Sequence, residues 1–119
     1  MLTLEQLQEY ATFVYESLDT HTKVKVCIFQ PGHPYSRCAH GLHTTNADGS
    51  RNVWLNLERR NGTAYADRFV LSVLGHELAH FWSEGHGKDF KKAQKRVRLV
   101  MRQYEKASLL PLQKTHTYC

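Results

Sequence analysis

The stretch Ala64-Tyr-Ala-Asp-Arg-Phe-Val-Leu-Ser-Val-Leu-Gly-His76-Glu-Leu-Ala-His80-Phe-Trp82 decides the fold of this chain. Its apolar residues fall nearly all round a helix rather than along one stripe, as expected of a helix that other elements surround. We therefore predict a helix over residues 64–82 as the central element, with the rest of a small domain packed around it.

The residues before the central helix predict one helix and a small sheet. Thr3 and Gln6 have the spacing of a capping box, and apolar residues then recur at helical spacing, which predicts a helix over residues 3–19. Alternating β-branched residues predict a strand over residues 23–29. Residues 37–45 are a weaker strand candidate.

A turn cluster at residues 46–50 precedes a further alternating strand at residues 53–57. After the central helix, apolar residues again mark one face of a helix that ends near residue 106. We expect an α+β domain over residues 1–108, with a small, mostly antiparallel three-stranded sheet, and an irregular tail over residues 109–119.

Composition limits the class of protein. The 119 residues are enough for one domain, and 41% hydrophobic with 23% charged residues is typical of a globular fold. No apolar run approaches the roughly 20 residues that a membrane span requires, and the first residues lack the pattern of a signal peptide. The three cysteines form no C-x-x-C pair, which favours a reducing compartment. We therefore expect a monomer in the cytoplasm that does not bind membranes.

The central helix contains His76-Glu77-Leu78-Ala79-His80, which has the form H-E-x-x-H. Residues four apart on a helix are rotated by a net angle of about 40° and separated by about 6 Å, so both imidazoles can bind one ion. Glu77 lies about 100° further round, where its carboxylate can reach a water molecule at an open coordination position of zinc. The motif therefore predicts a zinc site with Glu77 as general base. The alternative is that hydrogen bonds alone satisfy these side chains.

Catalytic zinc sites usually have three protein ligands, so one more is needed. We predict His86, because it opens the next helix and follows Gly85, which permits a sharp reversal. Glu84 is the alternative, because it would share the face of His76 and His80 if the helix continued for one more turn. A helix-cap or surface histidine is another interpretation of His86.

The run from His76 to Phe90, H-E-L-A-H-F-W-S-E-G-H-G-K-D-F, resembles the core of the SprT-like (Spartan-type) zinc metallopeptidases. In that family a Gly-His-Gly-x-x-Phe run follows H-E-x-x-H, supplies the third ligand and begins the next helix. A strand like residues 52–58 precedes the active-site helix. The resemblance implies a minimal zincin-like metallopeptidase. The five residues between the second and third histidines are closer to the related WLM peptidases, and the cysteine-rich ribbon of many members has no counterpart here.

The last predicted helix concentrates positive charge. Residues 88–106 hold eight of the sixteen Lys and Arg residues against two acids, a net charge of +6 in a chain of net charge +5. The eight are Lys88, Lys91, Lys92, Lys95, Arg96, Arg98, Arg102 and Lys106. Such a face can follow a phosphate backbone, and the family resemblance implies DNA-associated substrates. A solvated basic face is the alternative interpretation.

A second group of ligand-type side chains consists of His33, Cys38, His40 and His43. Its spacing matches no zinc module, and we interpret it as a hairpin that happens to contain these residues. The candidates for stabilising an oxyanion are Tyr35, Arg37 and Tyr65, among which the sequence does not choose. Cys119 is interpreted as an exposed terminal cysteine.

We predict a zinc-dependent metalloendopeptidase that acts on polypeptides, including proteins bound or crosslinked to DNA. A free sheet edge beside the metal would pair with the extended substrate. One alternative is a zinc hydrolase that cleaves another kind of bond, such as a YbeY-type endoribonuclease. That family shares the histidine spacing, but its motif resembles H-G-x-x-H rather than H-E-x-x-H. Another is a non-catalytic DNA-binding module that zinc stabilises. The metzincin pattern shares the histidine spacing, but Ser83 occupies its glycine position.

Overall fold

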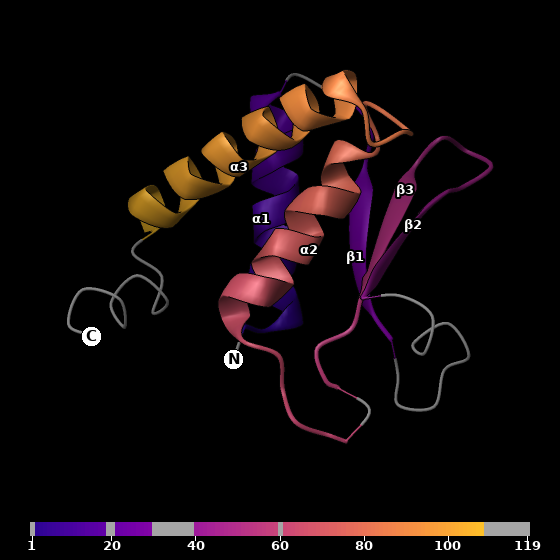
Figure 1. The fold of residues 1–119 in the computed structure, drawn as a ribbon. Helices are drawn as coiled ribbons and strands as arrows, with labels where there is room; N and C mark the ends of the chain where they lie inside the picture. The colour runs from indigo at the N-terminus through magenta and orange to yellow at the C-terminus, as the bar shows by residue number, and fades with distance from the viewer. Residues whose placement is uncertain (1, 19–20, 30–39, 60, 109–119) are drawn as a thin grey trace.

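A computed structural model gives the structure of the chain and describes residues 2–18, 21–29, 40–59 and 61–108 (Figure 1). The elements in chain order are α1 (Leu4–Ser17), β1 (Val24–Ile28), β2 (Gly41–Thr45), β3 (Arg51–Leu55), α2 (Asp67–Ala79) and α3 (Lys88–Ser108). The fold is α+β, as predicted. The central helix α2 is shorter at both ends than the predicted helix, and the predicted tail lies outside the described residues.

α1 begins at the predicted capping box. The hydroxyl of Thr3 accepts a hydrogen bond from the N–H of Gln6 at 3.1 Å, and the side-chain oxygen of Gln6 accepts one from the N–H of Thr3 at 2.9 Å. These bonds satisfy two N–H groups that have no partner inside the helix. The local sequence therefore fixes where α1 starts.

The three strands form one sheet in the order β1-β3-β2. β3 pairs antiparallel with β2 and parallel with β1, so the sheet is mixed. The prediction of a mostly antiparallel sheet was wrong in this respect. A short turn joins β2 to β3, but β1 lies on the opposite side of β3 from β2 and runs in the same direction as β3. The parallel pairing is therefore a consequence of chain routing, which strand periodicity does not encode.

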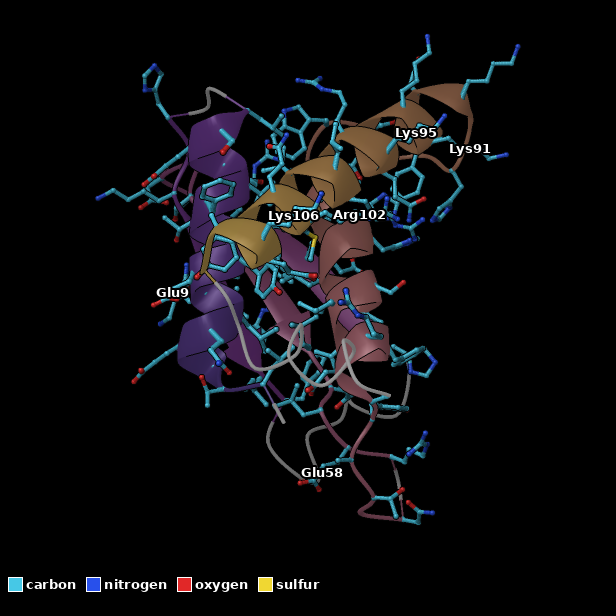
Figure 2. The ribbon with its side chains drawn as sticks, turned by 90° about the vertical axis from the view of Figure 1, so that its left-hand side faces the viewer. Glu9, Glu58, Lys91, Lys95, Arg102 and Lys106 are labelled. Carbon is cyan, nitrogen blue, oxygen red and sulfur yellow. The ribbon has the colours of Figure 1, made fainter. Side chains whose placement is uncertain are left out.

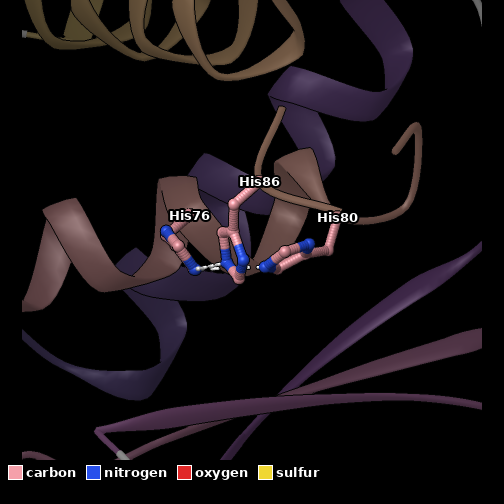
Figure 3. A group of neighbouring side chains, drawn as sticks. All are labelled: His76, His80 and His86. Carbon is pink, nitrogen blue, oxygen red and sulfur yellow. Dashed lines mark hydrogen bonds between the residues drawn. The ribbon is translucent and has the colours of Figure 1, made fainter. Parts of the chain in front are cut away.

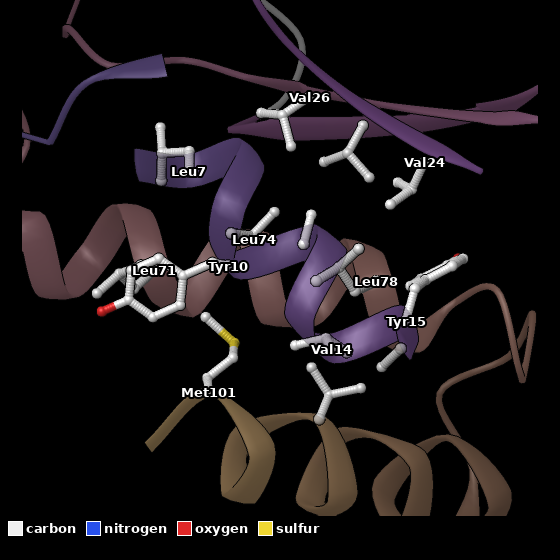
Figure 4. Packing of buried hydrophobic residues seen from close by; sticks show 14 of the residues in the cluster. Leu7, Tyr10, Val14, Tyr15, Val24, Val26, Leu71, Leu74, Leu78 and Met101 are labelled. Atoms are coloured by element: carbon white, nitrogen blue, oxygen red, sulfur yellow. The ribbon is translucent and has the colours of Figure 1, made fainter. Parts of the chain in front are cut away.

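The elements form three layers (Figure 1). α1 packs on β1, α2 packs on β2 and β3, and α3 lies across α1 and α2. The core fills the space between these layers (Figure 4), and its fully buried side chains include Leu7, Val14, Val53, Leu74 and Leu78. α2 thus has protein on most sides, as predicted. Its exposed residues Phe69 and Ser72 and the half-buried His76 face outward.

No helix within the described parts of the chain combines the length and the apolar character that crossing a membrane requires.

Candidate metal centre

The imidazoles of His76, His80 and His86 meet at the C-terminal end of α2 (Figure 3). Nε2 of His76 lies 3.1 Å from Nε2 of His80 and 3.4 Å from Nε2 of His86. Each ring offers one nitrogen, and these nitrogens all lie within 4.8 Å of one another. The three predicted histidines therefore lie close enough together to hold a metal ion.

Two of the three separations between the nitrogen atoms suit a tetrahedral ion, and the third pair lies within 4.8 Å. Zinc binds histidine nitrogen at about 2.0–2.1 Å, which places two tetrahedral ligand atoms about 3.3 Å apart. The observed distances of 3.1 and 3.4 Å are close to this value. Imidazole nitrogen suits zinc, copper, iron and nickel. The residues present thus fit a transition-metal ion, with room in a tetrahedral set for one ligand from outside the protein.

A tight turn after α2 brings His86 back to the helix. The N–H of Phe81 donates to the carbonyl of Leu78, and the N–H of Trp82 donates to the carbonyl of Ala79, so α2 ends abruptly. Gly85 is not among the described glycines with positive φ, and a Cβ added there would first meet a backbone atom at 4.0 Å. The reversal therefore does not depend on glycine at residue 85, contrary to the reason expected from the sequence.

Glu84, the alternative third ligand, lies outside the converging group. Its side chain is 89% exposed, and its contact with the site is a distance of 3.8 Å from Oε2 to Nε2 of His43. His86 supplies the third nitrogen instead.

Two neighbours fix the orientation of the histidine rings. Nδ1 of His80 lies 3.1 Å from the carbonyl oxygen of Ser83, and because a carbonyl only accepts, Nδ1 carries the hydrogen and Nε2 is free to bind a metal. The buried ring of Phe90 packs against all three imidazoles, with centroid separations of 5.0 Å to His76, 4.4 Å to His80 and 5.1 Å to His86. Phe90 thus forms an apolar wall behind the site.

The surroundings of His76 favour its neutral form. Burial lowers the pKa of His76, the carboxylate of Glu77 opposes this effect, and the neighbouring His80 and His86 lower the pKa further. A histidine must be neutral to bind a metal. These surroundings therefore favour the neutral state, in which the imidazole of His76 could bind a metal.

Glu77 is buried beside the histidines, with 8% of its surface exposed. Its Oε1 lies 2.7 Å from Nδ1 of His43, which comes from β2. β2 approaches α2 closely because residue 41 is glycine: a Cβ there would lie 2.7 Å from Cγ1 of Val73 and 3.1 Å from Cγ of Glu77. The site therefore includes a residue of the sheet as well as residues of α2.

His43 is the site residue whose role the sequence did not reveal. It lies in the β2–β3 hairpin, as predicted, but its ring stacks on His80 with a centroid separation of 4.9 Å. His40 lies elsewhere, with Nδ1 3.2 Å from the hydroxyl of Tyr65. The signal for His43 was its place two residues after Gly41, which puts both residues on one face of a strand.

The other candidates are placed as follows. Tyr65 bonds to His40, and its ring packs against Phe69 near the start of α2. The remaining candidates lie outside the described residues: His33, Tyr35, Arg37, Cys38 and Cys119.

The eight basic residues of α3 are all exposed, and Figure 2 shows four of them spread along the helix. Of the two acids in the same segment, Glu105 is buried and accepts two hydrogen bonds from the guanidinium of Arg68, at 2.9 and 3.1 Å. Asp89 is therefore the one exposed acid among residues 88–106, and the outer face of α3 is strongly positive.

Comparison of this chain with protein-family models, with curated proteins and with solved structures gives no match. What the site can do therefore follows from its own residues.

Proposed function

We propose that this chain is a zinc-dependent metalloendopeptidase in which His76, His80 and His86 hold the ion and Glu77 is the general base. The observation that supports it is the convergence of three imidazole nitrogens beside a buried carboxylate. A zinc ion held there would make a water molecule more acidic and polarise the carbonyl group of a substrate. Glu77 would accept a proton from the attacking water and pass it to the leaving amine.

The edges of the sheet favour a polypeptide substrate at β2. The edge of β1 is closed by Gln8, whose side-chain amide donates to the carbonyl of Val24 at 2.9 Å and accepts from the N–H of Val26 at 2.8 Å. β2 pairs only with β3 among the residues that the structure describes. An extended peptide that added to β2 would lie next to His43 and hence next to the site.

The hairpin register determines which backbone groups of β2 such a peptide would meet. The N–H of Asn46 donates to the carbonyl of Ser50, which makes this a hydrogen-bonded pair. Hydrogen-bonded and non-hydrogen-bonded pairs alternate along an antiparallel ladder. The N–H and C=O groups of Gly41, His43 and Thr45 therefore point away from β3, toward the incoming strand.

The decisive experiment compares the wild-type protein with Glu77→Gln on an unfolded protein substrate, with and without DNA, after the zinc content of both has been measured. We expect zinc in both proteins and cleavage by the wild type alone. The matched control is Glu16→Gln, which changes an exposed carboxylate of α1 and should cleave normally. Degradation of nucleic acid in place of protein would support the nuclease alternative. If the zinc-loaded wild type cleaves neither protein nor nucleic acid, the result would support the non-catalytic binding module.

The positive face of α3 supports a nucleic-acid partner for the same enzyme. Lys91, Lys95, Arg98, Arg102 and Lys106 recur at spacings of three or four residues, which aligns them along one side of the helix. Such a row can neutralise successive phosphates and would bring the site to proteins on DNA.

Binding to a short DNA duplex, measured over a range of salt concentrations, tests this partner. Replacing Lys95 and Arg98 by alanine should lower the magnitude of the slope of log affinity against log salt by about 2. Lys25→Ala, which removes an exposed lysine of β1, is the control and should leave the slope unchanged. A wild-type affinity that does not respond to salt would exclude this role for α3.

A further inference from the structure

His43 contacts Glu77, and the proposed reaction assigns no role to this contact. Nδ1 of His43 and Oε1 of Glu77 are 2.7 Å apart, across 34 positions of the chain. A carboxylate oxygen only accepts hydrogen bonds, so Nδ1 carries the hydrogen and donates it. A hydrogen bond to an ionised acceptor is among the stronger kinds in proteins. One oxygen of the proposed general base is therefore held by the sheet.

The ring of His43 is itself held in place on two sides. It stacks on the ring of His80 at 4.9 Å and 22°, and the ring of Phe81 meets it edge-on at 5.4 Å. Its position on β2 is opposite Val53, which is fully buried at the centre of the sheet. The donor atom is thus fixed by strand pairing and by ring packing, so it can fix the carboxylate in turn.

We propose that His43 is a positioning residue that holds the carboxylate of Glu77 in the orientation needed for proton transfer; this rests on the proposed function. Glu77 has three side-chain torsions, and an unrestrained carboxylate would sample orientations that face away from the attacking water. His43 exchanges no proton in this role. The proton that Glu77 takes from water leaves with the amine, and the Nδ1–H bond remains intact throughout.

The competing interpretation is that the hydrogen bond only ties β2 to α2. In that case its loss would lower the stability of the fold and leave the turnover of the surviving folded enzyme unchanged. The positioning role instead predicts a lower kcat in folded, zinc-loaded protein. Two substitutions separate these roles: His43→Leu removes the donor at similar size, and His43→Asn keeps an N–H donor close to the position of Nδ1.

The experiment measures kcat, KM, zinc content and thermal unfolding for the wild type and both variants. For His43→Leu we expect zinc to be retained, KM to be nearly unchanged and kcat to fall by about 10- to 100-fold, the scale of loss from a misplaced catalytic group. His43→Asn should recover most of this loss. The control His21→Leu, at an exposed histidine between α1 and β1, should match the wild type. Full turnover by folded His43→Leu, or equal losses in both variants, would overturn the proposal.

A double-mutant cycle and a spectrum provide further tests. If His43 acts through Glu77, adding His43→Leu to Glu77→Gln should lower the residual rate no further, whereas an independent role would multiply the two losses. The nitrogen-15 spectrum of the His43 ring should show hydrogen on Nδ1 in the wild type, and hydrogen on Nε2 alone would overturn the proposal without any activity measurement. A wild type that shows the Nδ1 signal but no zinc-dependent cleavage would reject the proposed function, and the positioning role with it.

Discussion

The ring of Phe90 packs against the imidazole of His80, with centroids 4.4 Å apart and planes tilted by 31°. Phe90 is buried at the start of α3 and also meets the rings of His76 and His86. It is therefore the residue through which α3 supports all three proposed ligands. Its place in the Gly-His-Gly-x-x-Phe run has a structural reason, because Phe90 is the third residue of α3 and lies four positions after His86.

We predict that Phe90→Ala weakens zinc binding more than its loss of stability explains. Removing the ring should lower the zinc affinity by about 10- to 100-fold, the usual effect of losing a group that orients metal ligands. The same change should destabilise the fold by about 3–5 kcal/mol. Zinc affinity is measured by competition with a chromogenic chelator. Leu7→Ala, a buried truncation in α1, is the control: it should lower stability but leave zinc affinity unchanged.

The choice between His86 and Glu84 gives a second prediction. His86→Ala should lower zinc affinity by more than about 100-fold, because loss of a supporting partner alone costs 10- to 100-fold. Glu84→Ala should keep zinc, because the side chain is 89% exposed and lies outside the group of converging nitrogens. Mass spectrometry of the folded proteins reads the metal content directly. Retention of zinc by His86→Ala and its loss from Glu84→Ala would reverse the assignment.

The sequence predicts the parts of this site that depend on local geometry. His76 and His80 are four residues apart on one helix, so their convergence follows from helical pitch. The capping box at Thr3 is equally local, and it formed as predicted. The position of His86 depends on a turn of only a few residues, and its place beside His76 and His80 was predicted correctly, although the role given to Gly85 was not.

The sequence does not predict features that depend on which strands become neighbours. The parallel pairing of β1 with β3 requires that the chain pass to the far side of β3 before it forms β2. The contact of His43 with Glu77 depends on that placement of β2 and spans 34 residues. Strand alternation gives the face on which a residue lies, but not the helix that covers that face. For this reason the weak strand pattern at residues 41–45 did not indicate that His43 lies at the site.

Gly41 gives a prediction about how β2 reaches the site. A Cβ at this position would lie 2.7 Å from Cγ1 of Val73, and valine is stiff about χ1, so β2 and α2 would have to move apart. Gly41→Ala should destabilise the protein by about 1–3 kcal/mol in chemical denaturation. Gly87→Ala is the matched control, because a Cβ there meets nothing within 4 Å. Equal stability of Gly41→Ala and the wild type would show that the strand and helix separate without cost.

The raised pKa values of three tyrosines lead us to predict that the fold loses stability at alkaline pH. Burial raises the pKa of Tyr10 and Tyr15 far above the ordinary value near 10, and burial together with the hydrogen bond to Glu9 raises the pKa of Tyr104 to about 12. In the unfolded chain these phenols lose their protons near pH 10. Between pH 10 and 12 the native state therefore holds more protons than the unfolded state, so stability falls as pH rises.

Each of the two buried phenols, Tyr10 and Tyr15, should contribute a slope of about 1.4 kcal/mol per pH unit in that window. Denaturant unfolding at a series of pH values from 8 to 12 measures the slope. Burial also raises the pKa of the Cys27 thiol, which acts in the same direction, so the comparison is best made in a Cys27→Ala background. There, Tyr10→Phe combined with Tyr15→Phe should flatten the decline, since neither phenylalanine can ionise when the chain unfolds. A decline as steep as in the tyrosine-containing protein would mean that other groups cause the alkaline unfolding.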